Sequence, residues 1–147
     1  MAIHFEAYLA WCDENEIPLA IVSDGLDFYI ERILANHRLL ERISCFSNEL
    51  TFADTNRIEA RFPYFSKGCG RCANCKAYHV REARKDGSKV IFIGDGLSDR
   101  CGAQAADYTF ARRGRDLERF CDAHGIKHVK FDSFDVVLQE TKDIVTG

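Results

Sequence analysis

KVIFIGDGLSDR, residues 89–100, is the stretch of this sequence that decides the expected fold. Its four apolar residues Val90–Ile93 are typical of a strand buried on both faces of a parallel sheet covered by helices. Asp95 and Asp99 follow this strand, at the place where open α/β sheets have their ligand crevice. Two carboxylates there suit a hard cation, although Asp and Gly also favour plain turns on conformational grounds. The local pattern alone leaves both interpretations open.

Length and composition predict a single globular domain. The chain has 147 residues, of which 46% are hydrophobic and 29% charged, which is ordinary for one domain. A formal net charge of -3 gives no electrostatic reason to expect nucleic acid or an anionic membrane as partner. No apolar run approaches the roughly 20 residues that cross a bilayer, and no signal peptide is recognisable. We therefore expect a cytoplasmic protein with a small-molecule partner.

Strand, loop and helix alternate on both sides of the opening stretch. Upstream, the pattern predicts a helix over 3–15, a buried strand over 19–22 that ends at Ser23, a helix over 26–42, and a β-hairpin over 47–62 whose turn is DTN, 54–56. Downstream, it predicts helices over 76–85, 100–106 and 116–124, strands over 90–93, 108–111 and 128–131, and a last helix capped by Ser133. The fold class is α/β, with a small hairpin excursion.

The seven cysteines argue against a disulfide framework, because their number is odd and no secretion signal accompanies them. Cys69, Cys72 and Cys75 form CxxCxxC, a spacing that can wrap a soft cation such as Zn2+. A fourth ligand is needed, and the candidates are His79, one helical turn after the last cysteine, Cys45 and Cys101. The alternatives are a reduced loop without metal and an iron–sulfur cluster. Structural zinc would fix the loop that precedes Lys76.

Three chemical groups follow one another along the chain. Ser23 ends one buried strand, Lys76 opens a helix, and Asp95 with Asp99 follows the next buried strand. A hydroxyl, an ammonium and a carboxylate-bound divalent ion are the groups that hold a phosphoryl group while its charge redistributes. Each residue alone has an ordinary structural explanation, as a cap, a solvated surface residue or a turn. Their joint order favours a phosphate site.

The chain resembles the haloacid dehalogenase-like superfamily, in particular its phosphoserine phosphatase-like branch and the related methionine-salvage phosphatases. IPLAIVSDG (17–25) is similar to the second motif of that superfamily, VIFIGDGLSD (90–99) to the fourth, and SNELTF with RIEARF to its hairpin region. The resemblance covers roughly residues 3–138. It implies a Rossmann-like three-layer parallel sheet and a Mg2+-dependent phosphatase acting on a small phosphorylated metabolite.

The resemblance also implies roles for individual residues. Ser23 would be the phosphate-binding hydroxyl, and Asp24 and Gly25 would offer backbone amides. Lys76, eighteen positions before Gly94, lies where the third-motif lysine would. In the fourth motif, the Mg2+ ligand would be Asp95 and the supporting carboxylate would be Asp99.

The first motif of the superfamily, a strand ending in DxD, has no counterpart here. Its first Asp is the nucleophile and its second the general acid and base. Asp24 with Asp27, and Asp132 with Asp135, have the wrong spacing to replace it. We therefore expect either a truncated phosphatase without its nucleophile or a catalytically inactive phosphate- and Mg2+-binding regulatory module. A zinc-stabilised interaction domain is a third hypothesis.

The missing motif has a structural consequence. In the superfamily its strand is central, between the strand that ends at Ser23 and the strand that ends at Gly94. Its absence would leave two strand edges whose backbone groups need partners. We expect these two strands to close up against each other, or a second copy of the chain to supply the pairing through dimerisation or strand exchange.

Overall fold

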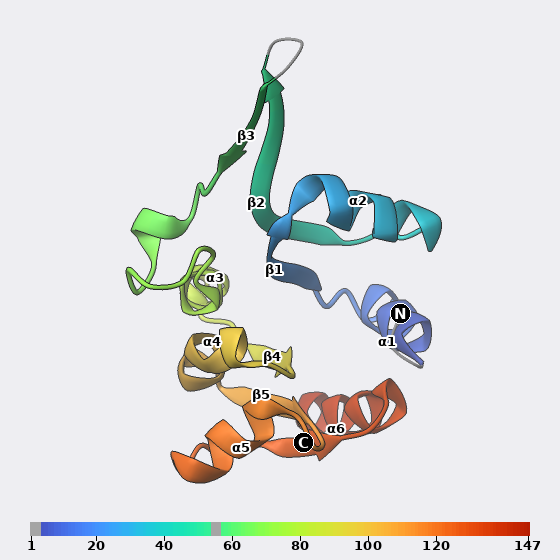
Figure 1. Cartoon of the computed structure of the whole chain (residues 1–147). Coiled ribbons are helices and arrows are strands. Elements are labelled where there is room, and N and C mark those ends of the chain that lie inside the picture. Colours follow the sequence, from blue (N-terminus) through green and yellow to red (C-terminus); the bar gives the residue numbers. More distant parts are fainter. Residues whose placement is uncertain (1–3, 54–56) are drawn as a thin grey trace. The chain divides into compact units, whose positions relative to one another are not determined.

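The structure is a computed structural model that describes residues 4–53 and 57–147. It consists of two compact units, each with a three-stranded sheet (Figure 1). Unit 1 comprises residues 1–19 and 89–147, and unit 2 comprises residues 20–88. Helices and parallel strands alternate in the chain, so the α/β class with a Rossmann-like core is confirmed. No helix among the described residues is both long and apolar enough to span a membrane.

Unit 1 contains a fully parallel sheet in the order β4-β5-β6. Its strands are β4 (Ile91–Gly94), β5 (Tyr108–Arg112) and β6 (Val129–Phe131). Its helices are α1 (Phe5–Glu14), α4 (Arg100–Ala105), α5 (Asp116–Ala123) and α6 (Phe134–Thr146), and a short 3-10 helix, η2 (Leu97–Asp99), follows β4. Each predicted helix and strand of this unit is present, within about two residues at most ends. Helical crossovers connect the parallel strands, as parallel pairing requires.

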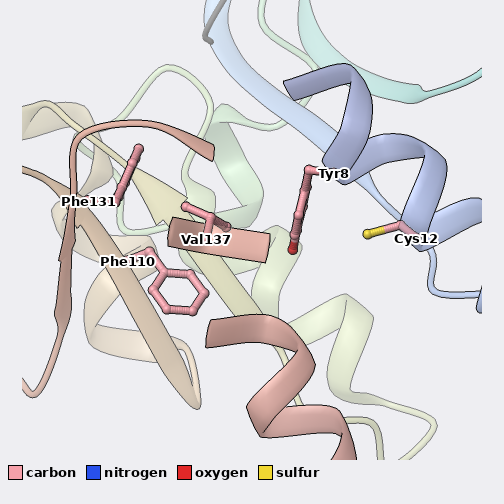
Figure 2. Packing of buried hydrophobic residues seen from close by; sticks show 5 residues of the cluster. All are labelled: Tyr8, Cys12, Phe110, Phe131 and Val137. Carbon is pink, nitrogen blue, oxygen red and sulfur yellow. The ribbon is translucent and has the colours of Figure 1, made fainter. Parts of the chain in front are cut away.

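Both faces of this sheet are covered by apolar side chains. One cluster joins Tyr8 and Cys12 of α1 with residues of β5, β6 and α6, and its labelled members are Tyr8, Cys12, Phe110, Phe131 and Val137 (Figure 2). Ile91 and Ile93 pack against this cluster, whereas Phe92 packs against a second cluster that includes Leu117 of α5. The alternation of β4 between two clusters confirms a strand covered on both faces, with burial that stabilises by roughly 1.5–3 kcal/mol for each fully buried large side chain.

Unit 2 contains a mixed sheet in the order β1-β2-β3. Its elements are β1 (Ala20–Leu26), α2 (Asp27–Asn36), β2 (Ser44–Ala53), β3 (Arg57–Arg61), η1 (Phe65–Lys67) and α3 (Lys76–Arg84). The first part of β2 pairs in parallel with β1, and its second part pairs antiparallel with β3. The predicted hairpin is therefore confirmed, although its expected turn at 54–56 lies outside the described residues.

Two predicted boundaries are wrong. The strand of unit 2 does not end at Ser23 but continues to Leu26 through a bulge, in which residues 23–25 lie opposite the single residue Ser47 of β2. Helix α2 ends at Asn36, not at residue 42, because the amides of Arg38 and Leu39 return to carbonyls of its last turn. This is a Schellman ending without the usual glycine, since Arg38 itself adopts φ 58°.

Ser133 occupies the N-cap position of α6, as predicted, although its side chain forms no capping hydrogen bond to the helix backbone. Its hydroxyl donates to the carboxylate of Asp135 instead.

Strands β1 and β4 are both edge strands of their own sheets. Within its own unit, β1 pairs with β2 and β4 pairs with β5. Closure of the two strands against each other stays a prediction, and so does the pairing of either edge with a second copy of the chain.

Candidate functional site

The loop that follows β4 is folded around one carboxylate. Asp99 is buried, and its Oδ2 accepts hydrogen bonds from the backbone N–H groups of Asp95 (2.8 Å) and Gly96 (3.0 Å). A Cβ on Gly94 would lie 2.6 Å from Cγ of Asp99, so only glycine leaves room for this side chain to fold back. Asp99 thus fixes the loop, because charge-assisted hydrogen bonds are roughly twice as strong as neutral ones.

Asp95 presents its carboxylate at the top of this loop. Its backbone is held from both sides, since its carbonyl also accepts a hydrogen bond of 2.9 Å from the N–H of Leu117. The side chain is exposed, and among the described residues of unit 1 none forms a hydrogen bond or ion pair with its carboxylate. An exposed carboxylate on a rigid backbone has the oxygen chemistry that Mg2+ prefers. The donor chemistry of Asp95 is thus compatible with a hard cation, and Asp99 fixes the backbone that carries this side chain.

The bulge of β1 carries the predicted phosphate-binding residues of unit 2. Oγ of Ser23 accepts a hydrogen bond from the N–H of Gly25 at 3.0 Å. This leaves the hydroxyl hydrogen of Ser23 able to donate to a ligand. The amide of Gly25, which the resemblance assigns to the phosphate, is therefore already used within the bulge. Asp24 accepts a hydrogen bond at its carboxylate from the N–H of Asn74, at 3.1 Å.

Asn74 joins three separate segments of unit 2. It is fully buried, and its Nδ2 donates to the carbonyls of Ser23 (2.8 Å) and Phe46 (3.0 Å). Its Oδ1 lies 2.6 Å from Nε2 of His79. Because an amide oxygen can only accept, we assign the Nε2–H tautomer to this histidine. One side chain thus connects the bulge of β1, the strand β2 and the helix α3.

Lys76 and His79 lie on α3, directly after Asn74. Lys76 is the first residue of the helix and is buried, as expected only for an ammonium that has partners. The ring of His79 stacks on the ring of Phe46, with 4.8 Å between the ring centroids, and contacts the ring of Tyr64 edge-on, with 4.6 Å between the centroids. Burial lowers the pKa of His79, and the nearby charge of Glu82 opposes this shift only in part. His79 is therefore a neutral packing residue that holds Asn74.

The cysteine loop precedes α3. The sulfur atoms of Cys69, Cys72 and Cys75 lie within 4.8 Å of one another, and those of Cys69 and Cys72 are 3.5 Å apart. Hydrogen bonds from the backbone N–H groups of Arg71, which has the larger effect, and Cys72 lower the pKa of Cys69 to about 6. His79, predicted as the fourth ligand, does not belong to this group of potential ligands, since its Nε2 is bonded to Asn74.

Sequence reasoning missed Asn74 altogether. The only signal was a polar amide between two cysteines, in a loop that was otherwise attributed to metal binding. Its partners are far away in the sequence, 28 residues for Phe46 and 51 for Ser23. A local pattern carries no information about such contacts.

Comparisons with known proteins include a phosphatase family model and several phosphatases. A family model described as a putative phosphatase matches residues 4–137. The chain is 34% identical over 141 residues to the 2-hydroxy-3-keto-5-methylthiopentenyl-1-phosphate phosphatase of Exiguobacterium sibiricum, covering 94% of the chain and 63% of that protein. The enzyme of the same name from Geobacillus kaustophilus is 37% identical over 147 residues, with 96% and 64% covered.

A further relative is the bifunctional enzyme MtnB/MtnX of Bacillus licheniformis, which is 35% identical over 145 residues. The alignment covers 95% of the chain but 33% of that enzyme. The chain thus spans between one third and somewhat under two thirds of the length of these relatives.

Proposed function

The chain belongs to the putative-phosphatase family, within the haloacid dehalogenase-like phosphatases, and on this premise we propose that it is the core of a Mg2+-dependent phosphatase for a small phosphorylated metabolite. The substrate class is a phosphomonoester like the one named for its relatives, which carries a methylthio-pentenyl chain. Because the chain covers part of those relatives, this activity is proposed for the whole protein to which the chain corresponds.

The observation that carries the proposal is the loop around Asp99. It presents the carboxylate of Asp95 exposed and without a partner among the described residues of unit 1, on a backbone fixed at both its N–H and its carbonyl. Such preorganisation means that little reorganisation is needed when a cation binds. When bound there, Mg2+ would neutralise the charge of the phosphoryl group. In this proposal Asp95 holds the cation and Asp99 positions Asp95.

Ser23 and Lys76 are proposed to hold the phosphate in unit 2. Oγ of Ser23 accepts a hydrogen bond from the N–H of Gly25. The hydroxyl hydrogen of Ser23 is therefore directed away from that amide and can be donated to a phosphate oxygen. The ammonium of Lys76 supplies positive charge at the start of α3. Asn74 fixes the carbonyl of Ser23 and thereby the bulge that carries the hydroxyl. We assign no nucleophile within this sequence, since no DxD pattern occurs in it.

A hollow in unit 2 supports the choice of a small substrate. Phe62, Phe65, Arg71 and Ala73 line a volume of about 500 Å3, a size within the roughly 300–1,000 Å3 of small-molecule sites. Two phenyl rings suit a short apolar chain, and a guanidinium suits an anionic group. A phosphorylated metabolite with an apolar tail combines both features.

The test is a calorimetric titration of the purified chain with inorganic phosphate, with and without Mg2+. Phosphate should bind only when Mg2+ is present, and Asp95→Asn should weaken Mg2+ binding at least tenfold. Asp143→Asn, which removes an exposed carboxylate on α6, is the matched control and should bind Mg2+ like the unaltered chain. Phosphate binding that does not depend on Mg2+ or on Asp95 would overturn the proposal.

The same samples separate a phosphate-binding core from a complete enzyme. We expect binding without appreciable turnover of a generic phosphomonoester. Efficient turnover by the isolated chain, abolished by Asp95→Asn, would show that a residue of this sequence acts as the nucleophile and that our assignment is wrong.

A further inference from the structure

The cysteine loop of unit 2 has a geometry that the proposed phosphatase chemistry does not use. We propose that Cys69, Cys72 and Cys75 form a three-thiolate site for a soft divalent cation, Zn2+. The site is independent of the proposed phosphatase function, because none of its sulfur atoms is assigned to the phosphate or to Mg2+.

The positions of the three sulfur atoms fit a tetrahedral ion. A Zn–S bond of about 2.3 Å places two thiolates of one tetrahedron roughly 3.8 Å apart. The sulfurs of Cys69 and Cys72 are 3.5 Å apart, and all three sulfurs lie within 4.8 Å of one another. Only a small shift of the side chains is needed to reach bonding geometry. Unit 2 thus fills three positions of the ion and leaves the fourth to a ligand outside the loop.

The backbone of the loop is shaped to bring these sulfurs together. A Cβ on Gly68 would lie 2.1 Å from Cβ of Cys75, so the chain can pass this closely only at a glycine. Gly70 adopts φ 84°, in the left-handed region, and so turns the chain between Cys69 and Cys72. Backbone N–H groups of Arg71 and Cys72 donate to the sulfur of Cys69. Such outer hydrogen bonds orient ligands before a metal arrives.

The chemistry of the group selects the cation. Thiolates bind Zn2+ and similar soft ions, whereas Mg2+ and Ca2+ require oxygen ligands. The three cysteines have no carboxylate in their group, and all of them are free thiols. Because all three are free thiols, a disulfide does not explain why their sulfurs converge.

The site would anchor the start of α3. Cys75 is the residue that precedes the helix, it is fully buried, and Lys76 follows it directly. A metal bound to Cys75 would fix the first turn of α3 and the flanking Asn74. We therefore expect the bound ion to raise the thermal stability of the chain.

The test measures metal content and affinity. The chain, purified under reducing conditions without chelator, should contain about one equivalent of zinc by mass spectrometry. Replacing this ion by Co2+ should give the absorption of thiolate-to-cobalt charge transfer. Cys69→Ser and Cys72→Ser should each weaken Co2+ binding at least tenfold. These two side chains are at least partly exposed, so circular dichroism should show an unchanged fold, whereas the buried Cys75 is left intact.

Cys45→Ser is the matched control, because Cys45 lies in the same unit, on β2, outside the group of converging sulfurs. It should keep the full metal content, and so should Asp95→Asn, which separates this site from the proposed phosphatase site. Less than one-tenth equivalent of zinc in the unaltered chain would overturn the proposal. So would bound iron with visible absorption, a Cys69–Cys72 disulfide in metal-free protein, or Cys69→Ser binding Co2+ as tightly as the unaltered chain.

Discussion

The loop after β4 and the segment before α3 are held in different ways. In the first, Asp99 bonds to amides three and four residues away, so the loop is stabilised by its own residues. In the second, Asn74 bonds to carbonyls 28 and 51 residues away. The carboxylate loop therefore depends on local geometry, whereas the segment before α3 depends on the packing of unit 2.

Asn74→Ala should have the largest effect on stability. It removes the two hydrogen bonds donated by Nδ2 and leaves Nε2 of His79 without its acceptor. Each buried polar group that loses its partner costs about 1–3 kcal/mol, so the free energy of unfolding should fall by about 3–5 kcal/mol. Urea denaturation measures this change. Asn36→Ala, at an exposed position of α2, should change it by less than about 0.5 kcal/mol.

A small effect of Asn74→Ala on the free energy of unfolding would contradict the importance of its long-range hydrogen bonds. A decrease below about 1 kcal/mol would mean that the segment before α3 is held by its own residues.

Asp99→Ala should have the next largest effect. It removes two charge-assisted hydrogen bonds from the loop, and a loss of about 2–3 kcal/mol is expected. Mg2+ binding at Asp95 should weaken with it. Asp99→Asn keeps an acceptor oxygen and should lose less than half as much, by urea denaturation. Equal losses for the two variants would show that the charge of Asp99, and not merely an oxygen that accepts from the two amides, determines its role.

Gly94→Ala tests the local geometry of the carboxylate loop by adding a single methyl group next to Asp99. The new Cβ would lie 2.6 Å from Cγ of Asp99, and the carboxylate would have to move off the amides. A destabilisation of about 1–2 kcal/mol is expected for such overpacking. At Gly96, a Cβ would meet no atom within 4 Å, so Gly96→Ala is the control and should be close to neutral. Thermal unfolding of the two variants measures this difference, and equal stabilities would contradict the expected overpacking at Gly94.

Part of the pH dependence of stability should come from His79 in unit 2. The pKa of His79 is lowered in the folded chain, mainly by burial, so the unfolded chain binds its proton more readily. The stability contributed by neutral His79 is present above an unfolded pKa of about 6.5 and is lost as the pH falls towards the lowered folded pKa. His79→Gln, which can still donate to Asn74, should remove this part of the slope. The expectation would be contradicted if the free energy of unfolding of His79→Gln, measured by urea denaturation, changed between pH 7.5 and 5 as much as that of the unaltered chain.

The same comparison explains what could be predicted from the sequence. The strand around Ile91–Ile93 and the loop at Asp95 could be predicted, because an apolar run followed by GDG carries its own structural information. The bulge at residues 23–25 could not, since it depends on pairing with β2. The end of α2 at Asn36 was missed because Arg38, rather than a glycine, adopts the left-handed conformation that ends the helix. Asn74 was missed because its role exists only in the folded unit.

The most direct test of the central claim, that Asp95 holds the cation of the phosphatase core, is paramagnetic NMR with Mn2+ in place of Mg2+. Substoichiometric Mn2+ should broaden the backbone amide signals of Asp95 and Gly96 first. This broadening should disappear in Asp95→Asn. Broadening that persists in Asp95→Asn, or that begins at residues away from the loop after β4, would contradict it.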